Sequence, residues 1–444
     1  MAAVTILSVA KYNMALSGGK CDPPGLIHSY YALDKLKYAK ARGDRKGLDL
    51  NQLKKRLPPG MYKDIRGAVG LCLRHSQTIF PSYLFLLPEF LNEEWLASVD
   101  WHKGFHRDHV LHQPMCVYVG YELLRQPWAL GQKKVNLLEN CIDAFLESSH
   151  CQYLRDHISE LGGQRMFNRL AKLSRKTFGA YFKDIFFLAA MFHDIGYPWQ
   201  FANNLGNPLC SLSLGGNSLS MDPEVISRNY GDRLFMAPFK GYQLKAAAAP
   251  STWQDSLNEM VRQSVTVTHG LPGAINFLHL NDMLRKYPDH TKPMHRFGME
   301  WAAMAIMMHD MAKLYGRVEN GMLKVINPQL RVSFNRDPLS FLLTLTDLIQ
   351  DFGRPDSRFK THDNNKNIVT VRYRHRCERV ELKWDDNKKN LTILYKYKNK
   401  GDYLNNLLKF QPENEILYFD PEKGYLDYSW LGIERIKLAA AMYP

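Results

Sequence analysis

The feature that most constrains the fold of this chain is an apolar run that ends in a histidine and an aspartate. The uninterrupted apolar run 185–192 leads directly into His193 and Asp194, and Gly196 and Pro198 follow closely. The run predicts a buried helix that stops at the glycine and the proline. Burying an imidazole and a carboxylate without partners costs several kcal/mol. The pattern therefore predicts a helical core in which this pair faces a compensating positive charge.

Two further apolar segments carry the same kind of residue. Small and apolar side chains lie on every side of the predicted helix over 300–308, which is followed by His309 and Asp310. By analogy with the first run, His309 is a candidate metal ligand. Asp347 lies inside the apolar segment 341–349, so its carboxylate needs either a cation or a buried arginine as its partner.

The sequence indicates less clearly which of the other histidines are metal ligands. His269 stands at the entry of a predicted helix, beside glycines that allow a neighbouring backbone to approach closely. His109 and His112 are three residues apart and would share one face of a helix. His112 is the better ligand because Cys116 follows it at apolar helical spacing, which leaves His109 to face a substrate. Pro114 suits a first helical turn better than an interior, so the choice between the two histidines stays open.

These residues together form a candidate metal site. A single histidine on an apolar face is more often a hydrogen-bonded core residue than a ligand, so the joint pattern carries the prediction. Imidazoles and carboxylates without cysteine suit a divalent ion: Mn, Fe, Mg, Zn or Co. Two ions bridged by one aspartate would use the whole set and leave open positions for water. The predicted ligands are His112, His193, Asp194, His269, His309 and Asp347.

The predicted fold is mainly α, with a small α+β appendage at the C-terminus. Helical patterns cover 62–76, 108–127, 133–149, 178–193, 252–266, 271–286, 297–315 and 338–351. Alternating patterns predict an antiparallel meander, with strands at 368–374, 380–384 and 391–397, and two helices near 401–411 and 429–442. The segment 203–223 reads as a long loop. We expect three parts: a mixed segment 1–60, a helical domain 61–360 and an α+β domain 361–444.

Charge and cysteine content narrow the partners and the compartment. The 444 residues carry a formal net charge of +14, which favours anionic partners, above all a phosphate-bearing small molecule. Nucleic acid is not favoured, because the basic residues form no block. The odd count of 7 cysteines without a Cys-x-x-Cys pair fits a reducing cytoplasm. No apolar stretch predicts a membrane span, and residues 4–10 predict a strand rather than a signal peptide. The oligomeric state is not indicated.

The ligand order resembles that of the HD-domain superfamily of metal-dependent phosphohydrolases. The matching residues are His112, His193-Asp194, His269, His309 and Asp347, and the run 337–355 looks like a form of the final motif in bacterial members. The likeness covers about residues 100–355, and Pro114 and the loop 203–223 depart from it. It implies an HD-type helical bundle that hydrolyses a phosphomonoester or phosphodiester, often of a nucleotide.

This chemistry assigns provisional roles to residues around the metal ions. A bridging water would attack phosphorus in line, and cationic side chains would steady the phosphoryl oxygens. Arg107, Lys313 and Arg354 are the candidates for that role, although ordinary surface charge would also explain them. His109 or Asp310 could protonate the leaving oxygen, and Asp310 could instead orient a histidine.

Two other functions fit the same residues. An HD-type di-iron oxygenase would use imidazole and carboxylate ligands equally well. A non-catalytic module that senses a nucleotide would use the site for binding only. In that case the alternating Arg372, Arg374 and Arg376 could form a charged sheet face for RNA or an acidic protein, although a solvated outer face explains them as well.

Overall fold

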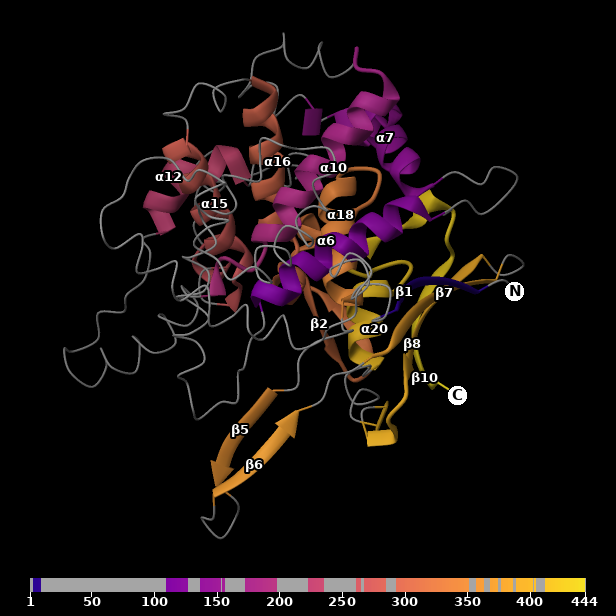
Figure 1. The fold of residues 1–444 in the computed structure, drawn as a ribbon. Helices are drawn as coiled ribbons and strands as arrows, with labels where there is room; N and C mark the ends of the chain where they lie inside the picture. Colours follow the sequence, from indigo (N-terminus) through magenta and orange to yellow (C-terminus); the bar gives the residue numbers. More distant parts are fainter. Residues whose placement is uncertain are drawn as a thin grey trace, which may run out of the picture.

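The described part of the chain is mainly α, with several small sheets (Figure 1). The helices gather in one region, and the four-stranded sheet lies beside them towards the C-terminus. The computed structural model describes residues 3–8, 109–126, 136–152, 154–155, 172–197, 223–234, 261–264, 267–284, 293–350, 357–362, 368–373, 377–385, 389–401, 403–404 and 412–443. The predicted helix 62–76 and almost all of the predicted loop 203–223 lie outside these residues.

Most of the described helices lie where the apolar patterns predict them. These are α6 (His109–Arg125), α7 (Leu137–Glu147), α10 (Arg175–Phe192), α15 (Gly270–Leu284), α16 (Pro293–Met308) and α18 (Pro338–Ile349). The single helix predicted over 297–315 is wrong, because α16 ends at Met308 and a separate short helix, α17 (Ala312–Tyr315), follows a turn. Helix α12 (Pro223–Leu234) was not predicted. Of the predicted helix 252–266, residues 261–264 are described and helical.

Side-chain caps fix where the two most informative helices begin. The hydroxyl of Ser174 accepts a hydrogen bond from the backbone N–H of Thr177 at the start of α10. At the start of α18, Asp337 accepts from the backbone N–H of Ser340, and Pro338 occupies the first turn. Both caps satisfy a backbone donor that has no partner inside the helix. Because each cap fixes the first residue of its helix, it also fixes how many turns separate that start from His193 after α10 or from Asp347 near the end of α18.

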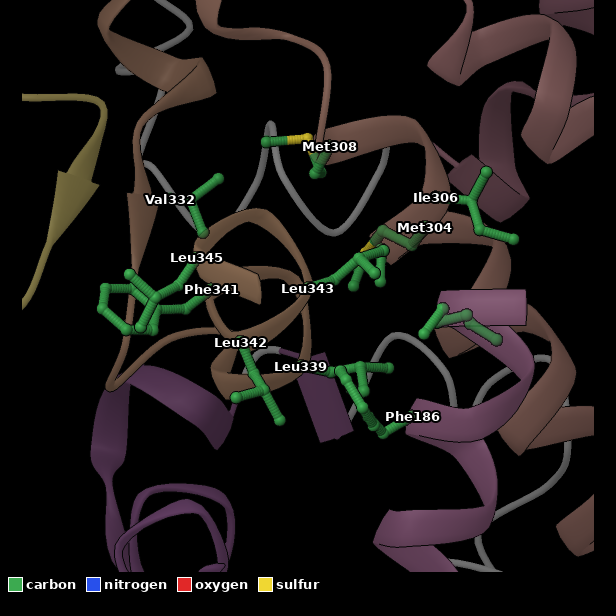
Figure 2. Packing of buried hydrophobic residues seen from close by; sticks show 14 of the residues in the cluster. Phe186, Met304, Ile306, Met308, Val332, Leu339, Phe341, Leu342, Leu343 and Leu345 are labelled. Atoms are coloured by element: carbon green, nitrogen blue, oxygen red, sulfur yellow. The ribbon is translucent and has the colours of Figure 1, made fainter. Parts of the chain in front are cut away.

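Helix α18 is the centre of the apolar core (Figure 2). Its side chains are buried on nearly every side, as expected for a helix without a polar face. Leu343 points towards Met304 of α16, and Leu339 points towards Phe186 of α10. Full burial of each such side chain is worth about 1.5–3 kcal/mol. The position of α18 between α6, α10 and α16 is therefore fixed by packing.

An aromatic cluster joins α7, α10 and α16 at the end of the core. Trp301 stacks on Phe145 with ring centroids 4.9 Å apart, and Phe145 stacks on Phe178 at 5.0 Å. Phe182 meets the edge of Trp301 at 5.7 Å. Such pairs add about 0.5–1.5 kcal/mol each beyond the area that they bury. The cluster thus packs the first half of α10 against the middle of α16.

A mixed four-stranded sheet contains strands from both ends of the chain, and these are its two outer strands. Its order is β1-β7-β8-β10, with β1 (Ala3–Ser8), β7 (Arg379–Asp385), β8 (Asn390–Tyr397) and β10 (Arg435–Met442). The pairs β1–β7 and β7–β8 are antiparallel, whereas β8 and β10 are parallel. The strand predicted near the N-terminus is thus confirmed, and it belongs to a sheet that is otherwise C-terminal.

Two predictions about the C-terminal region are wrong. The alternating segment 368–374 forms β6 (Ile368–Tyr373), but it pairs with β5 (Ser357–His362) in a separate hairpin rather than with β7 (Figure 1). The predicted helix 429–442 is mostly the strand β10, which pairs with the whole length of β8. A run of alanines near its end favours a helix locally, and the open edge of β8 overrides that preference.

The C-terminal region contacts the ends of two core helices. The hydroxyl of Tyr425 donates to the backbone oxygen of Met308, and that of Tyr395 donates to the backbone oxygen of Leu348. The remaining short elements are β2 (Gly316–Glu319), β3 (Met322–Val325), β4 (Val332–Ser333), α20 (Pro412–Phe419), β9 (Leu426–Asp427) and two 3-10 helices, Pro328–Leu330 and Ser429–Leu431. Strands β4 and β9 pair in parallel, and β4 contacts α18. Of the predicted helix 401–411, residues 401, 403 and 404 are described and helical. The division into three domains stays a prediction.

Candidate metal centre

Five helix ends or turns bring the six predicted ligands to one place. His112 lies in the first turn of α6, and Asp347 lies in the last turn of α18. The other four follow or precede helices: His193 and Asp194 follow α10, His309 follows α16, and His269 precedes α15. All four imidazoles are at least nine-tenths buried. The six predicted ligands, which are far apart in the sequence, therefore lie close together in the fold.

The first half of the cluster joins α6, α10 and α18. Nε2 of His112 lies 3.1 Å from Nε2 of His193 and 2.8 Å from Oδ1 of Asp347. Oδ2 of Asp194 lies 3.6 Å from the same nitrogen of His112. The side chain of Asp347 is 32% exposed, so this side of the cluster is open to solvent. A metal ion with bonds of about 2.1 Å would separate its donor atoms by about 3.0–3.4 Å, and the three spacings here lie on either side of that range or within it.

The second half of the cluster joins α10, α15 and α16. Nε2 of His269 lies 3.1 Å from Nε2 of His309 and 3.1 Å from Oδ1 of Asp194. The same oxygen of Asp194 lies 3.4 Å from Nε2 of His193. The carboxylate of Asp194 thus faces both pairs of histidines, one pair on each side. This is the position that a bridging carboxylate would occupy.

The Nδ1 atoms of the four histidines face away from the cluster and have partners of their own. Nδ1 of His193 donates to the backbone oxygen of Ala190 at 2.8 Å, and that of His309 donates to the backbone oxygen of Ile306 at 2.6 Å. A carbonyl oxygen can only accept, so in both neutral rings the proton is on Nδ1 and the lone pair is on Nε2. The inward nitrogens are therefore free to bind a cation.

Side chains hold the other two histidines in the same orientation. Oε1 of Gln350 accepts from Nδ1 of His112, and Oδ2 of Asp310 accepts from Nδ1 of His269, which lies 2.7 Å away. The same oxygen of Asp310 also accepts from the backbone N–H of His269 at 2.8 Å. Such outer partners fix the tautomer and the orientation of metal-binding histidines. All four Nε2 atoms consequently converge.

The electrostatics of the cluster show where positive charge is needed. Burial, together with the neighbouring His193 and His269, lowers the pKa of His309 to about 4. Burial also opposes protonation of His269, but the carboxylates of Asp310 and Asp194 outweigh it and raise its pKa to about 9. Burial would raise the pKa of Asp347, yet hydrogen bonds from His112 and His193 hold it well below its usual value. Without a metal ion, protons on the histidines therefore supply the cationic charge.

Asp310 and Lys313, which were predicted to act on the substrate, lie beside the second half of the cluster. Burial raises the pKa of Asp310, but the charge and hydrogen bond of His269 outweigh it and lower the pKa overall. Lys313 is exposed and adds to that lowering. A carboxylate held ionised is a poor proton donor, so this geometry favours Asp310 as the residue that orients His269.

Of three further predicted catalytic residues, the structure describes the backbone of one and the side chain of none. Arg107 and Arg354 lie outside the described residues. His109 begins α6, but its side chain is not among those described, so its role stays a prediction. Helix α6 begins before Pro114, which places His112 in its first turn and leaves His112 as the histidine that meets the cluster.

Sequence reasoning missed two residues of the cluster. Cys116 lies one helical turn after His112, and Gln350 lies three residues after Asp347. Both residues are one helical turn from a predicted ligand. In the sequence, however, Cys116 looks like an apolar core residue and Gln350 like an ordinary amide at a helix end, so neither indicates a metal site. With Cys116 included, the buried cluster of His, Cys and Asp can hold a metal ion.

No family model, no curated protein and no solved structure matches the chain. Among the residues that the structure describes, no helix is both long enough and apolar enough to cross a membrane. The function is therefore inferred from the chemistry of the buried cluster.

Proposed function

We propose that the protein is a metal-dependent phosphohydrolase of the HD-domain type. It acts on a phosphomonoester or phosphodiester, with a nucleotide as the favoured substrate class. The observation that carries the proposal is the convergence of four imidazole Nε2 atoms around the carboxylate of Asp194. Imidazole nitrogens held 3.1 Å apart need either a shared proton or a metal cation between them, and a divalent ion can take the place of the proton.

The arrangement favours two ions. One position would take His112, His193 and Asp347, and the other would take His269 and His309, with Asp194 shared between them. Divalent Mn, Fe, Mg, Zn or Co all suit nitrogen and oxygen donors of this kind. Bound metal ions supply an activated water and neutralise charge that develops on phosphoryl oxygens.

The residues of the chain then have distinct tasks. The histidines are held with Nε2 inward by Gln350, Asp310 and two backbone oxygens, so no reorientation is needed when an ion binds. The exposed edge at Asp347 is the side from which water and a phosphate group can approach. Lys313 lies near the second half of the cluster and is a candidate for contact with a phosphoryl oxygen.

The net charge of the chain agrees with this substrate class. A formal charge of +14 attracts phosphate-bearing molecules over distances longer than direct contact. It supports the encounter with an anion and does not select one nucleotide from another. The substrate must therefore be found by screening.

The proposal is tested by assaying phosphate release from a panel of nucleotides, cyclic dinucleotides and simple phosphoesters with Mn²⁺. We expect turnover that a chelator abolishes and Mn²⁺ restores. The double variant His193→Ala, Asp194→Ala should lose it, whereas His150→Ala, which changes an exposed histidine elsewhere, should keep it. Absence of metal-dependent turnover across the panel contradicts the proposal. Iron-dependent oxygen consumption would instead favour the oxygenase, and tight nucleotide binding without turnover would favour the sensing module.

A further inference from the structure

Tyr418 is a residue of the C-terminal region that lies close to the metal centre. It belongs to α20, which packs on the hairpin of β2 and β3 (Figure 1). The ring centroids of Tyr418 and Tyr425 lie 6.0 Å apart, and the hydroxyl of Tyr425 donates to the backbone oxygen of Met308. Because His309 follows Met308 directly, these contacts place Tyr418 near the end of α16 from which His309 enters the cluster.

The hydroxyl of Tyr418 interacts electrostatically with both halves of the metal centre. Burial raises its pKa, and the charges of Asp310 and Asp347 raise it as well. Asp310 orients His269 in the second half of the cluster, and Asp347 belongs to the first half and to its exposed edge. Interactions between charges fade within roughly 10 Å at moderate salt, so one hydroxyl that responds to both carboxylates lies near the cluster. With a raised pKa it keeps its proton at physiological pH.

This hydroxyl differs from those of the tyrosines around it. The hydroxyls of Tyr315, Tyr425 and Tyr428 each donate to a backbone oxygen, so these three side chains fasten the C-terminal region. Within the part of the chain that the structure describes, no group forms a hydrogen bond with the hydroxyl of Tyr418. Tyr418 is partly exposed, so its hydrogen-bond partner can come from solvent or from a bound molecule.

We propose that the hydroxyl of Tyr418 donates a hydrogen bond to a phosphoryl oxygen of the substrate at the metal centre. The nearby carboxylates of Asp310 and Asp347 are already bonded to histidines, so a bound phosphate supplies the acceptor. A phenol that keeps its proton can only donate to an anion, and such donors stabilise charge that develops on phosphoryl oxygens. Tyr418 is then a catalytic residue from outside the helices that carry the predicted ligands. This inference rests on the proposed function.

Inorganic phosphate is the probe for this contact. The full chain is loaded with Mn²⁺ and titrated with phosphate by calorimetry, as the wild type, Tyr418→Phe and Tyr428→Phe. We expect Tyr418→Phe to bind phosphate about 10–100-fold more weakly, as for a lost hydrogen bond to an anion, with Mn²⁺ affinity and melting temperature unchanged. Tyr428→Phe is the matched control. It loses the hydrogen bond to the backbone oxygen of Phe419, so its melting temperature should fall while its phosphate affinity is kept.

The outcomes separate this contact from the proposed function. Equal phosphate affinities of Tyr418→Phe and the wild type overturn the contact and leave the phosphohydrolase standing. A wild type that binds Mn²⁺ but no phosphate overturns both, and weaker Mn²⁺ binding by Tyr418→Phe shows a structural role instead of the proposed one. Should Tyr418→Phe fail to fold, a crystal structure of the Mn²⁺-loaded wild type with phosphate decides. A phosphate oxygen about 2.5–3.0 Å from the hydroxyl supports the proposal, and a hydroxyl without that contact contradicts it.

Discussion

Nε2 of His112 lies 3.1 Å from Nε2 of His193, although 81 residues separate the two in the sequence. His269 and His309 repeat the relationship at the same distance on the other side of Asp194. In each pair one member, His193 or His309, uses its Nδ1 proton on a backbone oxygen, so its Nε2 presents a lone pair to a proton or a metal ion held by its neighbour. These inward lone pairs are the physical basis of the proposed metal centre.

Gln350 should control metal affinity through His112. Its side-chain oxygen accepts from Nδ1 of His112, so Gln350→Leu removes the partner that fixes the ring. We expect Mn²⁺ affinity to fall by about 10–100-fold, as for other residues that support metal ligands. Gln350→Glu keeps the acceptor and should stay close to the wild type. Titration calorimetry measures both, and equal affinities of the Leu variant and the wild type would contradict the assigned role.

Metal affinity should rise with pH through the titration of His269. The Asp310 and Asp194 carboxylates outweigh burial and raise its pKa to about 9, so at neutral pH a metal ion must displace a proton from it. Below pH 9, affinity should increase by about tenfold per pH unit for each proton displaced. Calorimetry in buffers with different protonation enthalpies measures that proton release. A pH-independent affinity between pH 7 and 9 would rule out this linkage.

The same shift predicts the stability of the metal-free protein. A histidine with a raised folded pKa stabilises the fold fully below its unfolded value of 6.5, and this contribution is lost as pH rises through about 9. The melting temperature of chelator-treated protein should therefore fall over that range. Mn²⁺-loaded protein should lack this fall, because the ion replaces the proton. Parallel curves for the two samples would be inconsistent with this account.

Gly196 should be required for the approach of α10 to α15. A Cβ at this position would overlap the backbone oxygen of His269, which cannot move independently of the metal ligand. Gly196→Ala should cost about 1–3 kcal/mol or more and reduce metal binding. Gly401→Ala is the matched control, because a Cβ there meets only the side-chain oxygen of Asn399. Urea unfolding and Mn²⁺ titration of both variants test the prediction, which fails if the two behave alike.

Asp337 should stabilise the helix that carries Asp347. Its side chain accepts from the backbone N–H of Ser340 and from the indole N–H of Trp301 at 2.9 Å. Asp337→Ala removes the cap and leaves a buried indole donor without this acceptor, at a cost of about 1–3 kcal/mol. Asp337→Asn keeps a good cap and should lose much less. Equal unfolding free energies of the two variants would show that the cap is unimportant.

The sequence indicated the helices of the core and the residues of the cluster for a shared reason. Apolar runs define buried helices, and polar residues at their ends stand out because burial makes them costly. His193, Asp194, His309 and Asp347 were visible in this way, and the structure brings them together. The glycines beside His269 likewise indicated the close backbone contact that Gly196 makes.

Other features depend on contacts that no local pattern encodes. Most of the predicted C-terminal helix is the strand β10, which pairs with the edge of β8. Strand β6 pairs with β5 and not with β7. Cys116 and Gln350 became part of the cluster only through the packing of α6 against α18. When a residue joins a site only because its helix packs against another helix, the sequence around that residue does not indicate the site.

Anomalous diffraction from crystals of the wild-type protein soaked in Mn²⁺ tests the central claim most directly. We expect one peak between Nε2 of His112 and Nε2 of His193, and another between those of His269 and His309. Each should lie about 2.0–2.3 Å from its nitrogen donors, with Asp194 between the two. Ordered imidazoles with no anomalous peak at either position, at Mn²⁺ concentrations that saturate any binding seen in solution, would contradict the account.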